Sequence, residues 1–247
     1  MALEMFNLTL QSARMLSPKT RHLAFKREDG AALPFIPGQF ITLMFDAEGK
    51  VKRRSYSLSN SPDHSELEIA ISYVEGGVAS ERLFNLKEGE SVLAMGPAGR
   101  LVLQANEPDV KRYVLIGTGT GIAPYRAMVE QIARLAGQGV KFVIMQGVQY
   151  RQDLLYGEDF LALAKAQANA EFHAFYSREE IGVLPDAGAH EHQGYVQTYF
   201  NHLQLNPNED VVYLCGNPNM IDDAFALLTA QGFGPKNVRR EKYISSN

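Results

Sequence analysis

Apolar side chains in the first hundred residues fall in short stretches that alternate with polar positions or run continuously for a few residues. Turn-forming residues such as Pro37-Gly38 and Glu88-Gly89-Glu90 separate these stretches. Several short strands at this spacing predict an antiparallel barrel. The expected strands are Phe6–Leu16, His22–Lys26, Gln39–Phe45, Arg54–Leu58, Leu67–Tyr73 and Ser91–Met95. One short helix is expected within this region, at Ala79–Leu86.

The pattern changes after residue 106, where continuous apolar stretches alternate with segments of helical periodicity. Alternating strands and helices predict a parallel α/β sheet. The expected strands are Tyr113–Ile116, Phe142–Met145, Phe172–Tyr176 and Val211–Leu214, and the expected helices are Pro124–Ala136, Glu158–Ala168 and Pro218–Gln231. We therefore expect two domains, an antiparallel β-barrel over residues 1–106 and an α/β parallel-sheet domain over residues 107–247.

The composition excludes several classes of protein. Hydrophobic residues make up 45% and charged residues 21% of the 247 residues, which are values of a globular chain. The net charge of −4 gives no reason to expect a nucleic acid partner. A single cysteine cannot form an intramolecular disulfide, a zinc site or an iron–sulfur cluster, so any redox centre must be an acquired organic cofactor.

The sequence contains no secretory signal or membrane span. Its first residues lack a basic segment followed by an apolar one, and no run approaches the roughly 18 apolar residues that a span needs. The single cysteine indicates a reducing compartment. We expect a cytoplasmic protein with no membrane partner, and a monomer, because nothing suggests an obligate oligomer.

The glycine-rich run Gly117-Thr118-Gly119-Thr120-Gly121 follows an expected strand and precedes an expected helix. Glycines let the backbone approach a ligand, and the N–H groups at a helix N-terminus attract a pyrophosphate. The run is neither a GxGxxG fingerprint nor a P-loop. An ordinary tight turn is the alternative, but three glycines with two hydroxyl residues favour phosphate binding.

Two further motifs, Arg54-Ser55-Tyr56-Ser57 and Gly77-Val78-Ala79-Ser80, precede this run. An arginine in an extended segment offers a fork of donors to a pyrophosphate. Tyr56 provides a flat face and a hydroxyl suited to a flavin, and Ser57 provides a small donor and acceptor for a ring nitrogen. In this order, the three motifs resemble the flavin- and nucleotide-binding signature of the ferredoxin–NADP reductase family.

This resemblance extends from Pro37 to Tyr243 and implies FAD and NADP as cofactors. It implies FAD binding by Arg54, Ser55, Tyr56, Ser57, Ala70, Gly77, Val78, Ala79, Ser80 and Tyr243. It implies NADP binding by Gly117, Thr118, Gly119, Thr120, Ser177, Arg178, Tyr195, Gln197 and Gly216. Hydride transfer between nicotinamide C4 and flavin N5 would take place at Ser57, Cys215, Glu241 and Tyr243, with Glu241 and Ser57 a proton path to N5.

Ser177 and Arg178 bear on the choice between NADP and NAD. They end an expected strand at the carboxyl edge of the sheet, and a guanidinium with a nearby hydroxyl can hold the 2′-phosphate of NADP. In isolation, Arg178 would be read as a solvated loop charge. Tyr195 resembles the residue that stacks on adenine in the family, although Gln193 stands where plant members commonly have a lysine.

The last part of the chain resembles the reaction-site end of the family. Cys215 and Gly216 match the pair that lines the nicotinamide pocket, while Cys215 alone would be an inert buried thiol. Glu241 and Tyr243 match the Glu-x-Tyr that ends plant-type relatives, where the tyrosine stacks on the flavin. Here Ile244–Asn247 follow, and a polar frayed tail is the alternative.

The resemblance implies an FAD-dependent ferredoxin or flavodoxin NADP(+) reductase. The exposed charges of Lys50, Lys52 and Arg53 could steer an acidic electron carrier, or could simply be solvated. A reductase component that uses NAD(P)H to supply an oxygenase remains an alternative, as does a flavin-bearing electron-transfer subunit. Because subunits of that kind hold an iron–sulfur cluster, the single cysteine argues against the second alternative.

Overall fold

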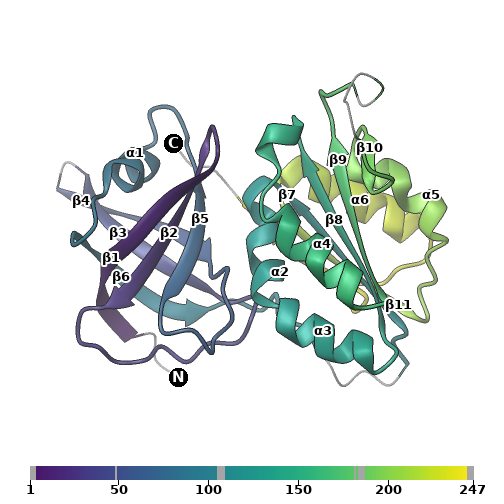
Figure 1. Cartoon of the computed structure of the whole chain (residues 1–247), viewed down its shortest axis with the longest axis horizontal. Helices are drawn as coiled ribbons and strands as arrows, with labels where there is room; N and C mark the ends of the chain where they lie inside the picture. Colours follow the sequence, from purple (N-terminus) through teal and green to yellow (C-terminus); the bar gives the residue numbers. More distant parts are fainter. Residues whose placement is uncertain (1–3, 48, 105–108, 181, 183–186, 244–247) are drawn as a thin grey trace. The chain divides into compact units, whose positions relative to one another are not determined.

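The first part of the chain forms a six-stranded antiparallel sheet in the computed structural model (Figure 1). The strands are β1 (Glu4–Ser17), β2 (Thr20–Arg27), β3 (Phe40–Ala47), β4 (Lys50–Ser57), β5 (Leu67–Ser72) and β6 (Ser91–Ala98). They lie in the order β4-β3-β6-β1-β2-β5, and all neighbours are antiparallel. The antiparallel fold expected for this region is confirmed.

The two edge strands of this sheet meet where β4 ends. Leu58, which follows β4, forms an antiparallel bridge with Ile69 of β5. The Ser59 N–H donates to the Glu68 carbonyl at 2.8 Å. Since these contacts pair backbone groups that edge strands otherwise leave open, they close the sheet into a barrel. Buried side chains such as Phe25 form its core, and helix α1 (Val78–Asn85) contacts β3 and β5.

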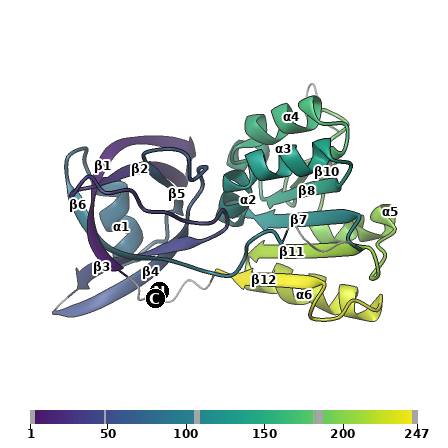
Figure 2. The same cartoon turned by 90° about the horizontal axis from the view of Figure 1, so that it is seen from below.

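The second part of the chain forms a parallel sheet in the order β10-β9-β8-β7-β11-β12. Its strands are β7 (Arg112–Thr118), β8 (Lys141–Val148), β9 (Ala170–Tyr176), β10 (Glu191–Gln193), β11 (Asp210–Gly216) and β12 (Val238–Lys242). Its main helices are α3 (Val129–Gly137), α4 (Gly157–Ala166), α5 (Phe200–Leu203) and α6 (Pro218–Ala230). Figure 2 shows α3 and α4 on one face of the sheet and α6 on the other. The expected α/β class is confirmed.

The strand order reverses between β7 and β11. From β7 the sheet continues through β8 and β9 on one side, and through β11 and β12 on the other. Open α/β sheets bind ligands outside the carboxyl ends of their strands at such a point. Residues Gly119–Ile122, a 3₁₀ turn after β7, and Asn217, which follows β11, therefore lie where a ligand is expected.

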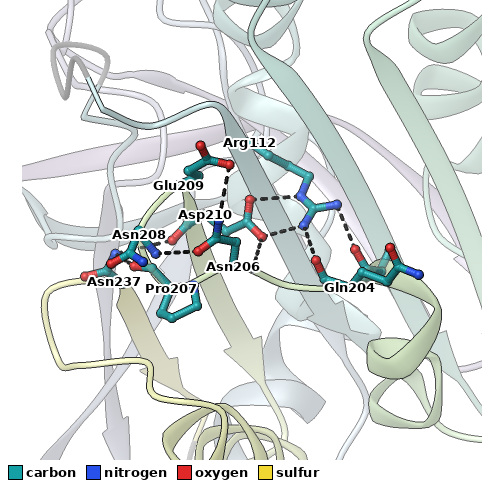
Figure 3. Close-up of polar contacts among 9 residues, drawn as sticks. Arg112, Gln204, Asn206, Pro207, Asn208, Glu209, Asp210 and Asn237 are labelled. Carbon is teal, nitrogen blue, oxygen red and sulfur yellow. Dashed lines mark hydrogen bonds and ion pairs between the residues drawn. The ribbon is translucent and has the colours of Figure 1, made fainter.

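A polar network fixes the opposite, amino-terminal edge of this sheet (Figure 3). Arg112 at the start of β7 pairs with the buried Asp210 at the start of β11 and donates to the Gln204 carbonyl at 3.3 Å. The Asp210 carboxylate also accepts from the Asn206 N–H at 2.7 Å. Since this edge lies away from the carboxyl ends of the strands, we assign the network to holding β7 against β11.

The helix expected at Pro124–Ala136 is interrupted. The chain forms α2 (Ala123–Ala127) and then α3, with Met128 between them. The Met128 N–H donates to the Tyr125 carbonyl three residues earlier, which is a tighter turn than an α-helix makes. Strands β10 and β12 and the short helix α5 were not expected from the sequence.

The α2 segment belongs with the barrel. The chain divides into two compact units. Of the described residues, the first unit combines those up to Leu103 with Ala123–Met128, whereas the second contains the other residues up to Ile122 and those from Val129 to Tyr243. In the first unit, Arg126 of α2 donates to the Ser59 carbonyl at 2.9 Å and pairs with Glu68 at 2.5 Å.

The structure describes residues 4–47, 49–104, 109–180, 182 and 187–243. The domain boundary expected between residues 106 and 107 lies outside the described residues. So does the C-terminal extension Ile244–Asn247. Within the described ranges, no helix combines the length and the apolar character that a bilayer crossing requires.

Candidate functional site

Arg54 and Tyr56 lie on the same side of β4. The β3–β4 register places them opposite Leu43 and Ile41, whose side chains are fully buried in the barrel. Tyr56 packs partly against this core, and burial raises the pKa of its hydroxyl to about 12, with the Arg54 charge opposing the rise. Tyr56 is therefore a neutral phenol at ordinary pH and can donate a hydrogen bond.

Ser55 and Ser57 alternate with these residues along the strand. The Ser55 hydroxyl lies 3.0 Å from that of Thr42. Ser57 is buried and precedes Leu58, while the buried Ala70 follows Ile69. Because Leu58 and Ile69 form the bridge that closes the barrel, closure brings Ser57 and Ala70 to the same end of the β4–β5 contact.

The beginning of α1 offers backbone donors. Gly77 is the N-cap and has no side chain that could occupy the N–H groups of the first turn. A Cβ at Gly77 would lie 2.8 Å from the Ser80 hydroxyl and 3.0 Å from the Val74 carbonyl oxygen. Val78 is 44% exposed. This glycine-lined helix start fits a phosphate of FAD, with the N–H groups of Val78 and Ala79 as donors.

The Ser80 hydroxyl bonds to the backbone of the turn before α1. It donates to the carbonyls of Val74 and Gly77 at 2.9 Å, and it also accepts from the Val74 N–H at 3.2 Å. The side chain is buried and holds the turn before α1. These contacts fix the turn before α1, and the phosphate contact expected for Ser80 stays a prediction.

In the second unit, the loops after β7 and β11 are in close contact. A Cβ at Gly117 would lie 2.9 Å from the Gly121 carbonyl, and a Cβ at Gly121 would lie 2.6 Å from the Cys215 carbonyl carbon. Gly216 has a φ of +118°, and a Cβ there would meet the Thr118 hydroxyl at 2.5 Å. These three glycines therefore permit an approach that no other residue would allow.

The outer side of the glycine-rich run is open. Gly119 has a φ of +52°, and a Cβ built there would have no described atom within 4 Å. Gly119 and Thr120 are both half-buried. The Thr118 hydroxyl faces the other loop, where it accepts from the Asn217 N–H at 2.8 Å. The open turn at the switch point fits a dinucleotide pyrophosphate, as the sequence suggested.

Cys215, Gly216, Glu241 and Tyr243 are brought together by the pairing of β11 with β12. Cys215 is opposite Glu241, and the Tyr243 N–H donates to the Gly216 carbonyl at 2.8 Å. The Cys215 side chain is fully buried. Burial raises the pKa of its thiol, the Glu241 charge adds to that rise, and a hydrogen bond with Tyr243 opposes it. Cys215 is therefore a neutral thiol, and we expect no nucleophilic role.

The expected adenosine-side residues follow the adjacent strands β9 and β10. The Ser177 N–H and hydroxyl both donate to the Val148 carbonyl, at 3.0 and 3.4 Å. Arg178 is exposed, and no hydrogen bond or ion pair to another described residue holds its guanidinium. The Gly194 N–H donates to the Tyr176 carbonyl at 2.9 Å, which keeps the two strand ends adjacent.

Tyr195 and Gln197 lie just beyond Gly194. The Tyr195 ring is 63% exposed, which is high for an aromatic side chain. The Gln197 Oε1 is buried and has no hydrogen-bond partner among the described residues. Because buried polar atoms normally have a partner, this orphaned acceptor fits a segment that is completed by a ligand.

Two groups next to these residues were not identified from the sequence. Arg151 after β8 forms an ion pair with the buried carboxylate of Glu191 in β10. The only sequence signal would have been two opposite charges near strand ends, and nothing pairs them before the sheet order is known.

A cluster of aromatic rings, which consists of His173, His192, Tyr199 and His202, supports the same edge of the sheet. The His173 Nδ1 lies 3.0 Å from the His192 Nε2, and the His173 Nε2 lies 3.4 Å from a Glu171 oxygen. Burial lowers the pKa of His192 below its ordinary value of 6.5, and His173, His190 and His202 lower it further. His192 is therefore held as a neutral ring.

This arrangement predicts a loss of stability in acid. Below pH 6.5 the unfolded chain binds a proton at His192 that the folded chain resists, so the free energy of unfolding falls as the pH drops. His192→Phe keeps the stacking on Phe175 and Tyr199 and should reduce this dependence. Denaturant unfolding at pH 7.5 and 5.5 measures it, with His64→Phe in an exposed loop as the control. Equal acid losses in wild type and His192→Phe would contradict the assignment.

Comparison with known proteins places this geometry in a family. Residues 7–103 match the oxidoreductase FAD-binding domain, and residues 115–225 match the oxidoreductase NAD-binding domain. The chain is 33% identical to the toluate 1,2-dioxygenase electron transfer component of Pseudomonas putida, over 98% of this chain and 68% of that protein. It is 32% identical to ferredoxin–NADP reductase B of Sorangium cellulosum, over 97% of this chain and 98% of that protein.

The fold also matches solved structures. The crystal structure of an Amycolatopsis cytochrome P450 reductase superposes with a TM-score of 0.86 and 27% identity, over 99% of this chain and 71% of that one. The barrel with its open α1 start matches the FAD-binding domain, and the parallel sheet with its glycine-rich turn matches the nicotinamide-dinucleotide-binding domain. The chain therefore belongs to the ferredoxin–NADP reductase family of FAD-containing oxidoreductases.

Proposed function

We propose that this protein is an FAD-dependent reductase that exchanges electrons between NADPH and ferredoxin or flavodoxin. The observation that carries the choice of NADPH is Arg178, which is exposed after β9, while the exposed Tyr195 follows the adjacent strand β10. A 2′-phosphate gives such a guanidinium two acceptor oxygens, whereas the ribose hydroxyl of NADH does not. Full-length similarity to ferredoxin–NADP reductase B of Sorangium cellulosum supports the choice of carrier.

The residues of the chain have separate roles in this proposal. Bound FAD supplies the chemistry that couples two-electron hydride exchange with one-electron transfer. Arg54 and the start of α1 hold its pyrophosphate, and Tyr56 and Ser57 contact the flavin end. The turn at Gly119 and Thr120 holds the nicotinamide nucleotide, and Cys215 and Gly216 line its nicotinamide pocket beside Glu241 of β12. Lys50, Lys52 and Arg53 are exposed on β4 and attract an acidic carrier.

A second candidate function is that of the reductase component of an oxygenase system. The 33% identity to the toluate dioxygenase component supports it. About a third of that component lies outside the segment that it shares with this chain, and its partners are those of the whole protein.

The proposal is tested by following electron transfer with two nucleotides and three acceptors. The purified holoprotein should reduce ferredoxin or flavodoxin faster with NADPH than with NADH, and faster than it supports an oxygenase. Arg178→Ala should raise the KM for NADPH by about tenfold or more and leave that for NADH nearly unchanged.

Arg134→Ala is the matched control, because Arg134 is an exposed arginine of α3 in the same unit. Equal losses with both nucleotides in Arg178→Ala would assign Arg178 a structural role. A wild type that prefers NADH, or that transfers electrons to the oxygenase alone, would favour the second candidate.

A further inference from the structure

Glu191 is a buried carboxylate that the proposed function leaves without a role. It lies in β10, and its side chain is only 3% exposed. Its oxygens accept from the Tyr176 hydroxyl at 2.6 Å, the Gly188 N–H at 2.9 Å, and the Arg151 Nε and Nη2 at 2.9 and 3.0 Å. Four donors from three segments therefore converge on one carboxylate.

These donors keep Glu191 ionised. Burial alone would raise the pKa of Glu191, but the hydrogen bonds from Tyr176 and Gly188 and the Arg151 charge outweigh burial and lower it. Burial and the contact with Glu191 raise the pKa of the Tyr176 hydroxyl, and Arg151 opposes that rise. A buried charge left without its partner destabilises a protein by more than the intact pair stabilises it. Removing one member of this pair should therefore loosen β10 from the sheet.

Arg151 connects this carboxylate to the loop that carries Arg178. It stands in the 3₁₀ turn Arg151–Asp153 after β8, and its backbone N–H donates to a Glu179 oxygen at 2.9 Å. The side chain of Arg151 is 40% exposed. Arg151 thus joins the segments after β8 and β9 to strand β10.

β10 depends on such an anchor because it is short and lies at the edge of the sheet. It contains three residues and pairs with β9 alone. Only one residue, Gly194, separates it from Tyr195. Any shift of β10 therefore displaces the exposed ring of Tyr195 and the Gln197 Oε1, which has no hydrogen-bond partner among the described residues.

We propose that Arg151 and Glu191 are positioning residues for nicotinamide nucleotides, and that their ion pair holds β10 so that Tyr195 and Gln197 meet the adenosine end. This inference rests on the proposed function. The adenine ring and its ribose are common to NADP and NAD. Loss of the ion pair should therefore weaken the binding of both nucleotides equally. Arg178, in contrast, should discriminate between them.

The test measures nucleotide binding to the FAD-loaded protein by calorimetry with NADP⁺ and NAD⁺. Arg151→Ala and Glu191→Gln should each raise both Kd values by about tenfold, and the double variant should be no worse than either single variant. Arg151→Lys keeps the positive charge but loses the two-donor guanidinium contact, so its Kd values should lie between those of the wild type and Arg151→Ala. Tyr176→Phe removes one hydrogen-bond donor to Glu191 and should raise both Kd values about twofold to threefold. This milder variant replaces the others in the test if they do not fold.

Two further measurements separate positioning from general damage. FAD content and the kcat at saturating NADPH should stay at wild-type values, and the amide of Gly194 should exchange faster in Arg151→Ala. Glu209→Gln is the control. Glu209 pairs with Lys111 just before the starts of β11 and β7 in the same sheet, so this variant should leave both Kd values unchanged.

Three results would overturn the inference. Unchanged Kd values in both variants would show that β10 needs no such anchor. A loss of NADP⁺ binding alone in Arg151→Ala, with Glu191→Gln silent, would make Arg151 a direct phosphate ligand. Loss of FAD or of kcat would make the pair generally structural. A wild type that binds neither nucleotide would instead reject the proposed function.

Discussion

Arg54→Ala should bind FAD more weakly than the wild type by roughly 2–4 kcal/mol, because it loses a charged fork of donors in a half-buried position. Arg54 shares a side of β4 with Tyr56, so we expect its guanidinium and the Tyr56 ring to contact the same ligand. The measurement is the ratio of flavin to protein after purification, followed by titration of the apoprotein with FAD.

Arg53→Ala is the matched control for this variant. Arg53 is the preceding residue of the same strand, is exposed, and pairs with Met44 on the other side of the sheet. It should retain full FAD occupancy. If Arg54→Ala also keeps full occupancy and affinity, the pyrophosphate is held elsewhere.

Gly121→Ala should destabilise the second unit by at least about 3 kcal/mol, because the new methyl group would collide with backbone. Its Cβ would lie 2.6 Å from the Cys215 carbonyl carbon and 2.8 Å from the Gly216 Cα. Neither neighbour is a flexible side chain, so the loops after β7 and β11 would have to separate. We expect a lower denaturant midpoint and a loss of NADP⁺ binding.

Gly137→Ala provides the comparison within the same unit. A Cβ at Gly137 would meet only the Gln167 Oε1, at an ordinary distance of 3.7 Å. This variant should match or slightly exceed the wild-type stability. Equal stability of Gly121→Ala and Gly137→Ala would show that the two loops are not held in contact.

The sequence predicts the buried strands well and the polar edge strands poorly. β7 and β8 are continuous apolar runs, so their hydrophobic pattern alone locates them. β12 reads Val-Arg-Arg-Glu-Lys, and only Val238 is buried. β10 contains three polar residues. Both form because a neighbouring parallel strand provides backbone partners, which is information about the assembled sheet rather than about the segment itself.

The sequence is similarly limited in what it predicts about the site residues. Gly121 was expected in a phosphate-binding loop and Gly216 in the nicotinamide pocket, and the structure adds that these two glycines let the two loops touch. The structure also adds that the Ser80 hydroxyl bonds to Val74 and Gly77, contacts that its residue type alone did not predict. Residue type indicates which groups could bind, whereas their direction depends on the local turn.

The location of α2 limits how the two halves of this protein could be recombined with those of relatives. Arg126 binds the Ser59 carbonyl and Glu68 within the barrel unit, yet it follows the glycine-rich run in the chain. A chimaera joined between residues 106 and 107 would provide the barrel with a foreign α2. Glu68 would then face whatever residue the donor carries at this position. Successful exchange should therefore transfer residues 123–128 together with the barrel, so that the functional module is discontinuous in sequence.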